Sequence, residues 1–142
     1  MKNETPKKRQ TIEYFENGQK KSEFNFINNL PAGNQILFYE SGKKKACEHI
    51  TIRKGPIAEI KMTKWYENGQ KEFDVTYKDG KLDGKGTAWH ENGQIGGEGN
   101  YKDGKENGKV TKWYENGQKE AEAIYKDGEC ISGDCDYFKK DL

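Results

Sequence analysis

Apolar and polar residues alternate along short stretches of this chain, and turns that contain glycine separate the stretches. In residues 70–78, Phe73, Val75 and Tyr77 occupy every second position, with polar residues between them. Alternation with a period of two is typical of a β-strand that covers one face of a sheet. That segment has nine residues and the returning segment 81–91 has eleven, which leaves no room for a helix. The pattern therefore predicts antiparallel strands joined by tight turns.

Two kinds of glycine turn recur at a nearly fixed spacing. The tetrapeptide Glu-Asn-Gly-Gln occurs four times, with a decayed copy, Glu-Ser-Gly-Lys, and the dipeptide Asp-Gly recurs at intervals of 24 residues at 79–80, 103–104 and 127–128. Asn-Gly and Asp-Gly favour two-residue type I′ hairpin loops, because Asn, Asp and Gly tolerate positive φ. A period of this size indicates a repeat array, in which each unit packs on its neighbours. The turn glycines are Gly18, Gly42, Gly69, Gly93 and Gly117, and Gly80, Gly104 and Gly128.

The repeat predicts an all-β fold, an elongated single-layer antiparallel array of hairpins with about 10–11 strands. We expect a flexible N-terminal tail over residues 1–11 and a second tail over 139–142. A half-repeat that begins near Cys135 is expected to close the last edge, with Phe138 aligned with the tryptophans. Lys54-Gly55-Pro56 replaces the Asp-Gly turn and predicts a wider loop, and Gly84 and Gly86 predict a bulge in the return strand. The five repeats are 12–37, 38–64, 65–88, 89–112 and 113–138.

Strand alternation assigns side chains to two faces. With two-residue loops, a core face is predicted to hold Tyr66, Phe73, Val75, Tyr77 and Leu82. The opposite face is predicted to hold Thr63, Trp65, Glu72, Asp74 and Thr76. A turn longer by one residue would exchange the two faces, because the side-chain period of a strand is two.

Aromatic residues form two columns, one position apart, when the repeats are aligned. The rings can pack between repeats as core, which is their usual role. Alternatively they line a surface that binds a partner, since Trp and Tyr are enriched among residues that dominate interfaces. The second alternative makes Trp65, Trp89, Trp113, Tyr66, His90 and Tyr114 candidate partner-binding residues.

Composition alone would suggest disorder, because the 142 residues are 31% hydrophobic and 35% charged. Aromatic residues in register with the repeat oppose that interpretation and predict a folded chain with a thin core. The net charge of +1 and short basic clusters predict no nucleic-acid binding. The chain has no long apolar run, and its first ten residues are polar, so a cytoplasmic location is expected. Export with the signal absent from this sequence is the alternative. Open terminal strands also make self-association through strand edges possible.

Candidate chemistry is sparse. Cys130 and Cys135 would lie opposite each other if Ser132-Gly133 formed a hairpin loop, and they could form a disulfide in an oxidising compartment. In the cytoplasm two free thiols are expected, and this alternative is favoured. Cys47 and His49 do not complete a metal site. The repeated Glu flanks a turn in every copy, so it is interpreted as architectural, and no catalytic constellation can be assembled. The sequence predicts no enzyme, no metal and no cofactor.

Trp65–Gly69 together with Tyr77–Gly84 resembles the MORN variant repeat, the bacterial relative of the membrane occupation and recognition nexus repeat. The resemblance covers about residues 12–138. Proteins made only of such units are grouped as YwqK-like antitoxins, so the resemblance implies non-catalytic binding of a partner protein, which for an antitoxin is a toxin. An exported or surface-associated module that contacts host or envelope components is the alternative. Phospholipid binding is a third possibility, although the chain has no dominant basic face.

Overall fold

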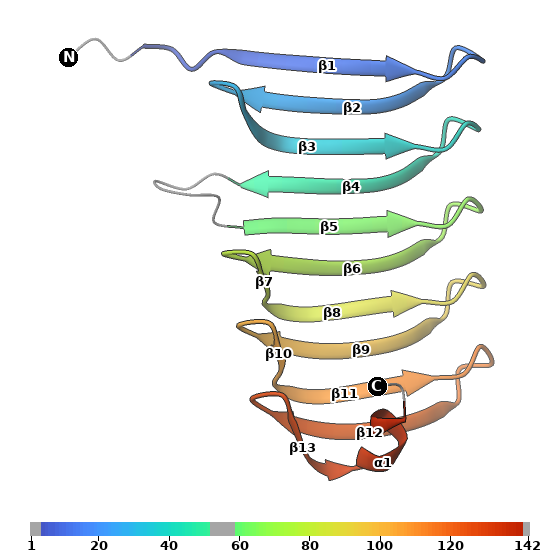
Figure 1. Cartoon of the computed structure of the whole chain (residues 1–142). Helices are drawn as coiled ribbons and strands as arrows, with labels where there is room; N and C mark the ends of the chain where they lie inside the picture. Colours follow the sequence, from blue (N-terminus) through green and yellow to red (C-terminus); the bar gives the residue numbers. More distant parts are fainter. Residues whose placement is uncertain (1–3, 52–58, 141–142) are drawn as a thin grey trace.

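The computed structural model describes residues 4–51 and 59–140, which fold into one open antiparallel sheet (Figure 1). Eleven of its thirteen strands follow one another across the sheet in chain order, and the two-residue strands β7 and β10 pair with β6 and β9. The predicted single-layer hairpin array is thereby confirmed. The strands are β1 (Lys8–Tyr14), β2 (Lys20–Ile27), β3 (Leu30–Phe38), β4 (Lys44–Thr51), β5 (Glu59–Trp65), β6 (Lys71–Lys78), β7 (Lys81–Leu82), β8 (Gly84–Trp89), β9 (Ile95–Lys102), β10 (Lys105–Glu106), β11 (Gly108–Trp113), β12 (Lys119–Lys126) and β13 (Glu129–Gly133).

The Asn-Gly turns are three-residue loops, so the predicted two-residue loop is wrong there. The Tyr66 N–H donates to the Gln70 carbonyl at 2.9 Å, and the Gly69 N–H donates to the Tyr66 carbonyl at 3.0 Å. Within this loop only Gly69 has positive φ, at 89°. A type I turn followed by a left-handed glycine is a common three-residue hairpin connection. Asn68 has negative φ, and its side-chain oxygen accepts the Gln70 N–H at 2.9 Å.

The Asp-Gly turns have the predicted geometry. Asp79 and Gly80 have φ of 48° and 77°, and Lys78 pairs with Lys81 across the turn. Two adjacent residues with positive φ define the type I′ loop. Asn28-Asn29 makes the same turn in the first repeat, with φ of 49° and 64°. This turn was not predicted, because it contains no glycine.

A bulge in β6 keeps the two faces as predicted, although the turn is longer than predicted. Trp65 pairs with Lys71, but Lys64 pairs with Phe73, so Glu72 is an extra residue. The third loop residue shifts the strand register by one, and the bulge shifts it back. The prediction for Glu72 was wrong: its carboxylate lies 3.2 Å from the Lys64 Nζ, on the face that carries Phe73.

We call one side of the sheet the groove face and the other the tryptophan face. Few side chains are fully buried in the described residues, and the buried hydrophobic ones are Ala32, Ile36, Ile50, Ala121 and Ala123. This is the thin core that one packed layer allows. The groove face carries Phe73, Val75, Leu82, Tyr101, Val110, Ala121 and Ala123, and the tryptophan face carries Trp65, Trp89, Trp113, Asp74, Glu98 and Glu122.

Glycines inside the return strand have two different roles. Gly84, with φ of 87°, begins β8 after the two-residue strand β7, and Gly108, with φ of 114°, begins β11 after β10, which accounts for the two strands beyond the predicted count. The predicted kink is therefore at Gly84. Gly86 instead leaves space for an aromatic ring, because a Cβ there would lie 3.2 Å from Cε2 of Tyr101.

The two ends of the array differ from the predictions. Strand β1 begins at Lys8 and pairs with β2 as far as Ile27, so the end of the predicted N-terminal tail is strand. The predicted half-repeat is a short helix, α1 (Cys135–Lys139), which lies beside β12 and β13 (Figure 1). Among the described residues, no helix is long and apolar enough to span a membrane. The wider loop predicted at Lys54-Gly55-Pro56 lies outside the described residues.

Candidate binding surfaces

The Glu-Asn-Gly-Gln motif holds neighbouring repeats together. The Asn68 Nδ2 donates to the carbonyl of Glu91 in the next turn at 2.7 Å, and Asn92 donates to Glu115 in the same way at 2.7 Å. A Cβ at Gly93 would lie 2.9 Å from Oε1 of Gln70, so the glutamine of one turn packs against the glycine of the next. These contacts explain why the motif recurs in each unit, since every unit must dock on its neighbour.

The decayed copy at residues 40–43 also donates a hydrogen bond to the next turn, but from a different side chain. A serine replaces the asparagine, and the Lys43 Nζ donates to the Glu67 carbonyl at 3.1 Å. The next repeat therefore still receives a hydrogen bond at this turn. An exposed lysine has more conformational freedom than an asparagine amide, so we expect this junction to be weaker.

The second aromatic column also links repeats. The Tyr66 hydroxyl donates to the Trp89 carbonyl at 2.8 Å, and Nε2 of His90, in the tautomer protonated there, donates to the Trp113 carbonyl at 2.8 Å. Burial, together with the charges of neighbouring glutamates, raises the pKa of Tyr66. Tyr114 directly precedes the last Glu-Asn-Gly-Gln turn and is 50% exposed. Two of the candidate partner-binding residues, Tyr66 and His90, thus have their polar atoms engaged within the array.

The three candidate tryptophans lie on the opposite side of the sheet from the groove. Trp65 and Trp113 face cross-strand lysines, and Lys71 places its Nζ 5.3 Å from the centre of the Trp89 ring. All three rings are partly exposed. No stacking between them is found in the described part of the chain, so they form a row of separate rings.

Carboxylates flank this row at the same 24-residue spacing. Asp74 lies 2.6 Å from Lys71, Glu98 lies 2.6 Å from Lys85, and Glu122 lies 2.7 Å from Lys119. Burial opposes ionisation of Asp74, but hydrogen bonds from Lys71 and Thr63 outweigh it, and the pKa of Asp74 lies below its ordinary value. The tryptophan face is therefore aromatic and carries paired charges of both signs.

The groove face carries a depression of about 220 Å³ between β6 and β11. Its floor consists of small residues on the two central strands, β8 and β9. Ala88 of β8 pairs with Phe73 of β6, and Gly86 of β8 pairs with Gly99 of β9. Burial raises the pKa of Tyr101, whose ring lies against Gly86 and Gly99. The groove lining includes Phe73, Val75, Leu82, Gly86, Ala88, Gly97, Gly99, Tyr101, Val110 and Lys112.

Sequence reasoning missed this groove. It treated the glycines as turn or bulge residues, whereas Gly86, Gly97 and Gly99 have ordinary strand conformations. The groove could have been predicted by comparing the repeats, because this repeat has glycine where other repeats have larger residues. Other repeats have Phe73 or Ala121 where this repeat has Gly97.

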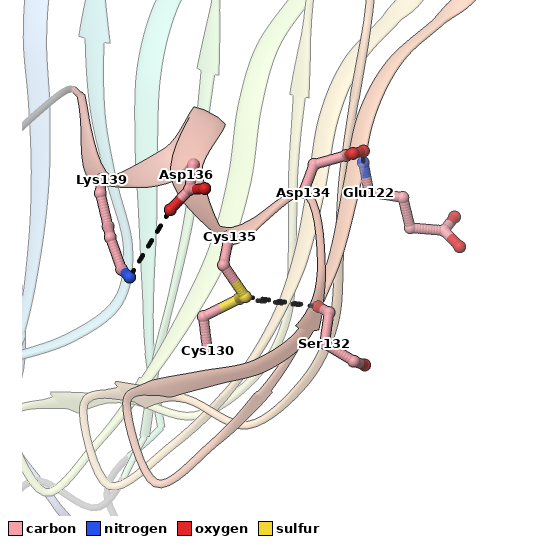
Figure 2. The surroundings of a disulfide bond; sticks show 7 residues. All are labelled: Glu122, Cys130, Ser132, Asp134, Cys135, Asp136 and Lys139. Carbon is pink, nitrogen blue, oxygen red and sulfur yellow. Dashed lines mark hydrogen bonds and ion pairs between the residues drawn. A yellow bond between two sulfur atoms is a disulfide. The ribbon is translucent and has the colours of Figure 1, made fainter.

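The C-terminal end is closed by a disulfide between Cys130 and Cys135, which joins β13 to the start of α1 (Figure 2). Their Cα atoms are 5.7 Å apart. The favoured expectation of two free thiols is thereby corrected, and so is the hairpin, because Ser132 and Gly133 belong to β13. Asp134 supports the junction: its Oδ2 accepts the Glu122 N–H at 2.9 Å (Figure 2). The third cysteine, Cys47, is a free thiol whose pKa is raised by burial.

No group of three or more His, Cys, Asp or Glu side chains is placed to hold a metal ion within residues 4–51 and 59–140. His49, half of the Cys-x-His pair in the sequence, lies with its Nδ1 2.7 Å from the Asn34 side-chain oxygen.

Comparison with known proteins gives one family. No curated protein matches the chain. The family model described as the MORN repeat variant matches residues 10–28, 58–79, 82–103 and 106–127, which make up more than half of the chain. Each matched segment contains one Glu-Asn-Gly-Gln turn. MORN repeats are generally involved in binding proteins or membrane lipids. Four matched segments in one continuous hairpin sheet establish that this chain belongs to the MORN repeat variant family.

Proposed function

We propose that this chain is a non-catalytic module that binds a partner protein on a face of its sheet. The groove supports the proposal most directly, because it is an apolar depression of about 220 Å³ on an otherwise extended surface. The same turn contacts recur from repeat to repeat and hold the repeats in fixed positions, so the side chains on both faces are preorganised. Preorganised surfaces lose less conformational entropy on binding.

A protein partner accounts for the surface charges better than a lipid surface does. Stable attraction to anionic lipids requires clusters of unpaired Lys and Arg near the membrane. On the tryptophan face Lys71, Lys85 and Lys119 are paired with carboxylates, and the net charge of the chain is only +1. We therefore expect co-sedimentation with vesicles to show no dependence on anionic lipid. Strong sedimentation with phosphatidylserine vesicles would favour the lipid function instead.

Capture of a partner from the native cell tests the proposal and locates the binding face. Gly97→Phe fills the groove, and Trp89→Leu alters the tryptophan face without touching the groove. We expect the wild-type chain to retain a specific protein and one of the two variants to lose it. Loss in Trp89→Leu would assign binding to the tryptophan row. A wild-type chain that retains no protein above the level of a bead control contradicts the proposed function.

An antitoxin or immunity role is a more specific form of this function, suggested by the resemblance to YwqK-like proteins. It requires the partner to be toxic in the absence of this chain. We therefore expect co-expression with the captured protein to relieve a growth arrest which that protein causes alone. A partner that does not impair growth would exclude this role and leave the binding function intact.

A second candidate is an exported module that contacts host or envelope components, and the disulfide favours it. Structural disulfides persist mainly in oxidising compartments, whereas cytosolic thiols are kept reduced. The test is to trap thiols by alkylation in intact cells, followed by fractionation. Blocked Cys130 and Cys135 in an exported fraction would support this candidate. If Cys130 and Cys135 are alkylated in the cytoplasmic fraction, they are free thiols there, which would support the expected cytoplasmic location and contradict this candidate.

A further inference from the structure

Helix α1 lies on the groove face of the last repeat and covers it with two aromatic rings. The Tyr137 hydroxyl donates to Oε1 of Glu120 at 2.7 Å, and the Phe138 ring meets the Tyr125 ring edge to face at 6.3 Å. Lys112 places its Nζ 5.3 Å and 5.6 Å from the centres of the two rings. At this end of the sheet Ala121 and Ala123 are only 2% and 0% exposed.

The open groove is the equivalent surface one repeat earlier. Gly97, Gly99 and Tyr101 stand 24 residues before Ala121, Ala123 and Tyr125, and all three line the groove. Two alanines in the covered repeat are thus two glycines in the open one, which makes the floor deeper. Lys112 belongs to both places, since it lines the groove and also lies against the rings of α1.

We infer that the groove binds a segment of a partner protein that presents adjacent aromatic side chains, in the way that α1 presents Tyr137 and Phe138. The inference rests on the proposed function and names the class of ligand. An apolar cavity of about 150 Å³ is known to hold a benzene-sized ring, and this groove has about 220 Å³.

The groove walls suit an aromatic ring for two further reasons. Phe73 and Tyr101 supply ring faces and edges with which an entering ring can form edge-to-face contacts. Lys112 at the rim can place its charge over a second ring, as it already does with Tyr137 and Phe138. The helix of this chain does not fill the groove itself, because the disulfide holds α1 on the last repeat.

The test is a titration followed by nuclear magnetic resonance, with the dipeptide acetyl-Tyr-Phe-amide as probe and acetyl-Ala-Ala-amide as its control. We expect saturable shifts of the Gly86, Gly97 and Gly99 amides with a Kd of about 1–10 mM, a range typical of small fragments. The alanine dipeptide should leave these amides unchanged. Shifts that are absent, or that gather around Trp65, Trp89 and Trp113, would overturn the inference.

Two variants at one position distinguish occupation of the groove from unfolding. A Cβ at Gly97 would meet only the Thr111 carbonyl, at 3.7 Å, so substitution there is sterically acceptable. Gly97→Ala copies Ala121 and is expected to keep dipeptide binding. Gly97→Phe copies Phe73, fills the groove and is expected to weaken binding at least about tenfold, while the remaining amide spectrum stays that of a folded chain. Undiminished binding by Gly97→Phe contradicts the inference.

The partner experiment separates this inference from the proposed function. If the wild-type chain captures a partner and Gly97→Phe captures it equally well, the groove inference fails while the protein-binding function stands. If no partner is captured but the dipeptide binds the groove, the proposed function fails and the aromatic specificity of the groove stands.

Discussion

Each residue of the Glu-Asn-Gly-Gln motif has an identifiable physical role. The glutamate carbonyl accepts from the preceding turn, and asparagine donates to the next turn and accepts from its own. Glycine adopts positive φ, and glutamine packs on the following glycine. The sequence correctly marked these positions as turns, because glycine and asparagine have strong conformational preferences. It could not show that Tyr66 and His90 bond to carbonyls of the next repeat, because these partners are 23 residues away.

The link made by Tyr66 predicts a measurable loss of stability. Tyr66→Phe removes the hydroxyl and leaves the Trp89 carbonyl without that donor, which should lower the free energy of unfolding by about 0.5–1.5 kcal/mol. Urea unfolding measures the change. Tyr114→Phe is the matched control, since this ring lies just before the last Glu-Asn-Gly-Gln turn and is 50% exposed, and the substitution should be nearly neutral. Equal effects of the two substitutions would show that the hydrogen bond does not link the repeats.

Asp74 predicts an acid-sensitive contribution to stability. Its pKa in the folded chain lies below the ordinary value of 3.8, so folding favours the ionised carboxylate. The resulting stability is fully present above that ordinary value and is lost as pH falls through the lowered value. Urea unfolding between pH 6 and pH 3 should therefore show a smaller loss for Asp74→Asn than for the wild-type chain. Identical pH dependence in the two proteins would contradict this role for Asp74.

At the level of strands and turns, two departures from the prediction cancel each other. The three-residue turn moves the register by one position, and the bulge at Glu72 moves it back, so Phe73 and Val75 remain on the predicted face. The short helix could not be predicted, because counting along the repeat places Phe138 in a strand. Tertiary contacts decide this segment: the disulfide and the hydrogen bond that the Glu122 N–H of β12 donates to Asp134 turn the chain out of strand β13 and onto the groove face.

The disulfide is expected to stabilise this end of the array. It closes a short loop, with a sequence separation of 5, and loop-closure entropy for this length corresponds to about 2 kcal/mol. The double variant Cys130→Ser/Cys135→Ser should therefore unfold at lower urea concentration and exchange the Ala123 amide hydrogen faster. Reductant should bring the wild-type chain to the level of the double variant and leave the variant unchanged. A reductant-insensitive wild type would show that the bond does not stabilise the fold.

For the whole molecule, the array explains how a chain that is 31% hydrophobic can fold. Each hairpin packs only on its neighbours, so a thin layer of buried side chains and many repeated backbone hydrogen bonds hold the sheet together. The same construction leaves both faces open and places one row of side chains from every repeat on each of them. The proposed binding surfaces are therefore properties of the assembled faces, and no single repeat contains the groove.

The sequence by itself determined the period, the positions of the turns that contain glycine, the antiparallel hairpins and, apart from Glu72, the two faces. It did so because glycine conformation and strand alternation act over a few residues. Only the tertiary structure determined the presence of the groove, the hydrogen bonds that Tyr66 and His90 make to the next repeat, and the position of α1 on the last repeat. These features join residues on different strands, as where Gly86 of β8, Gly99 of β9 and Val110 of β11 meet. Their positions follow from the register between strands, which a bulge of one residue is enough to change.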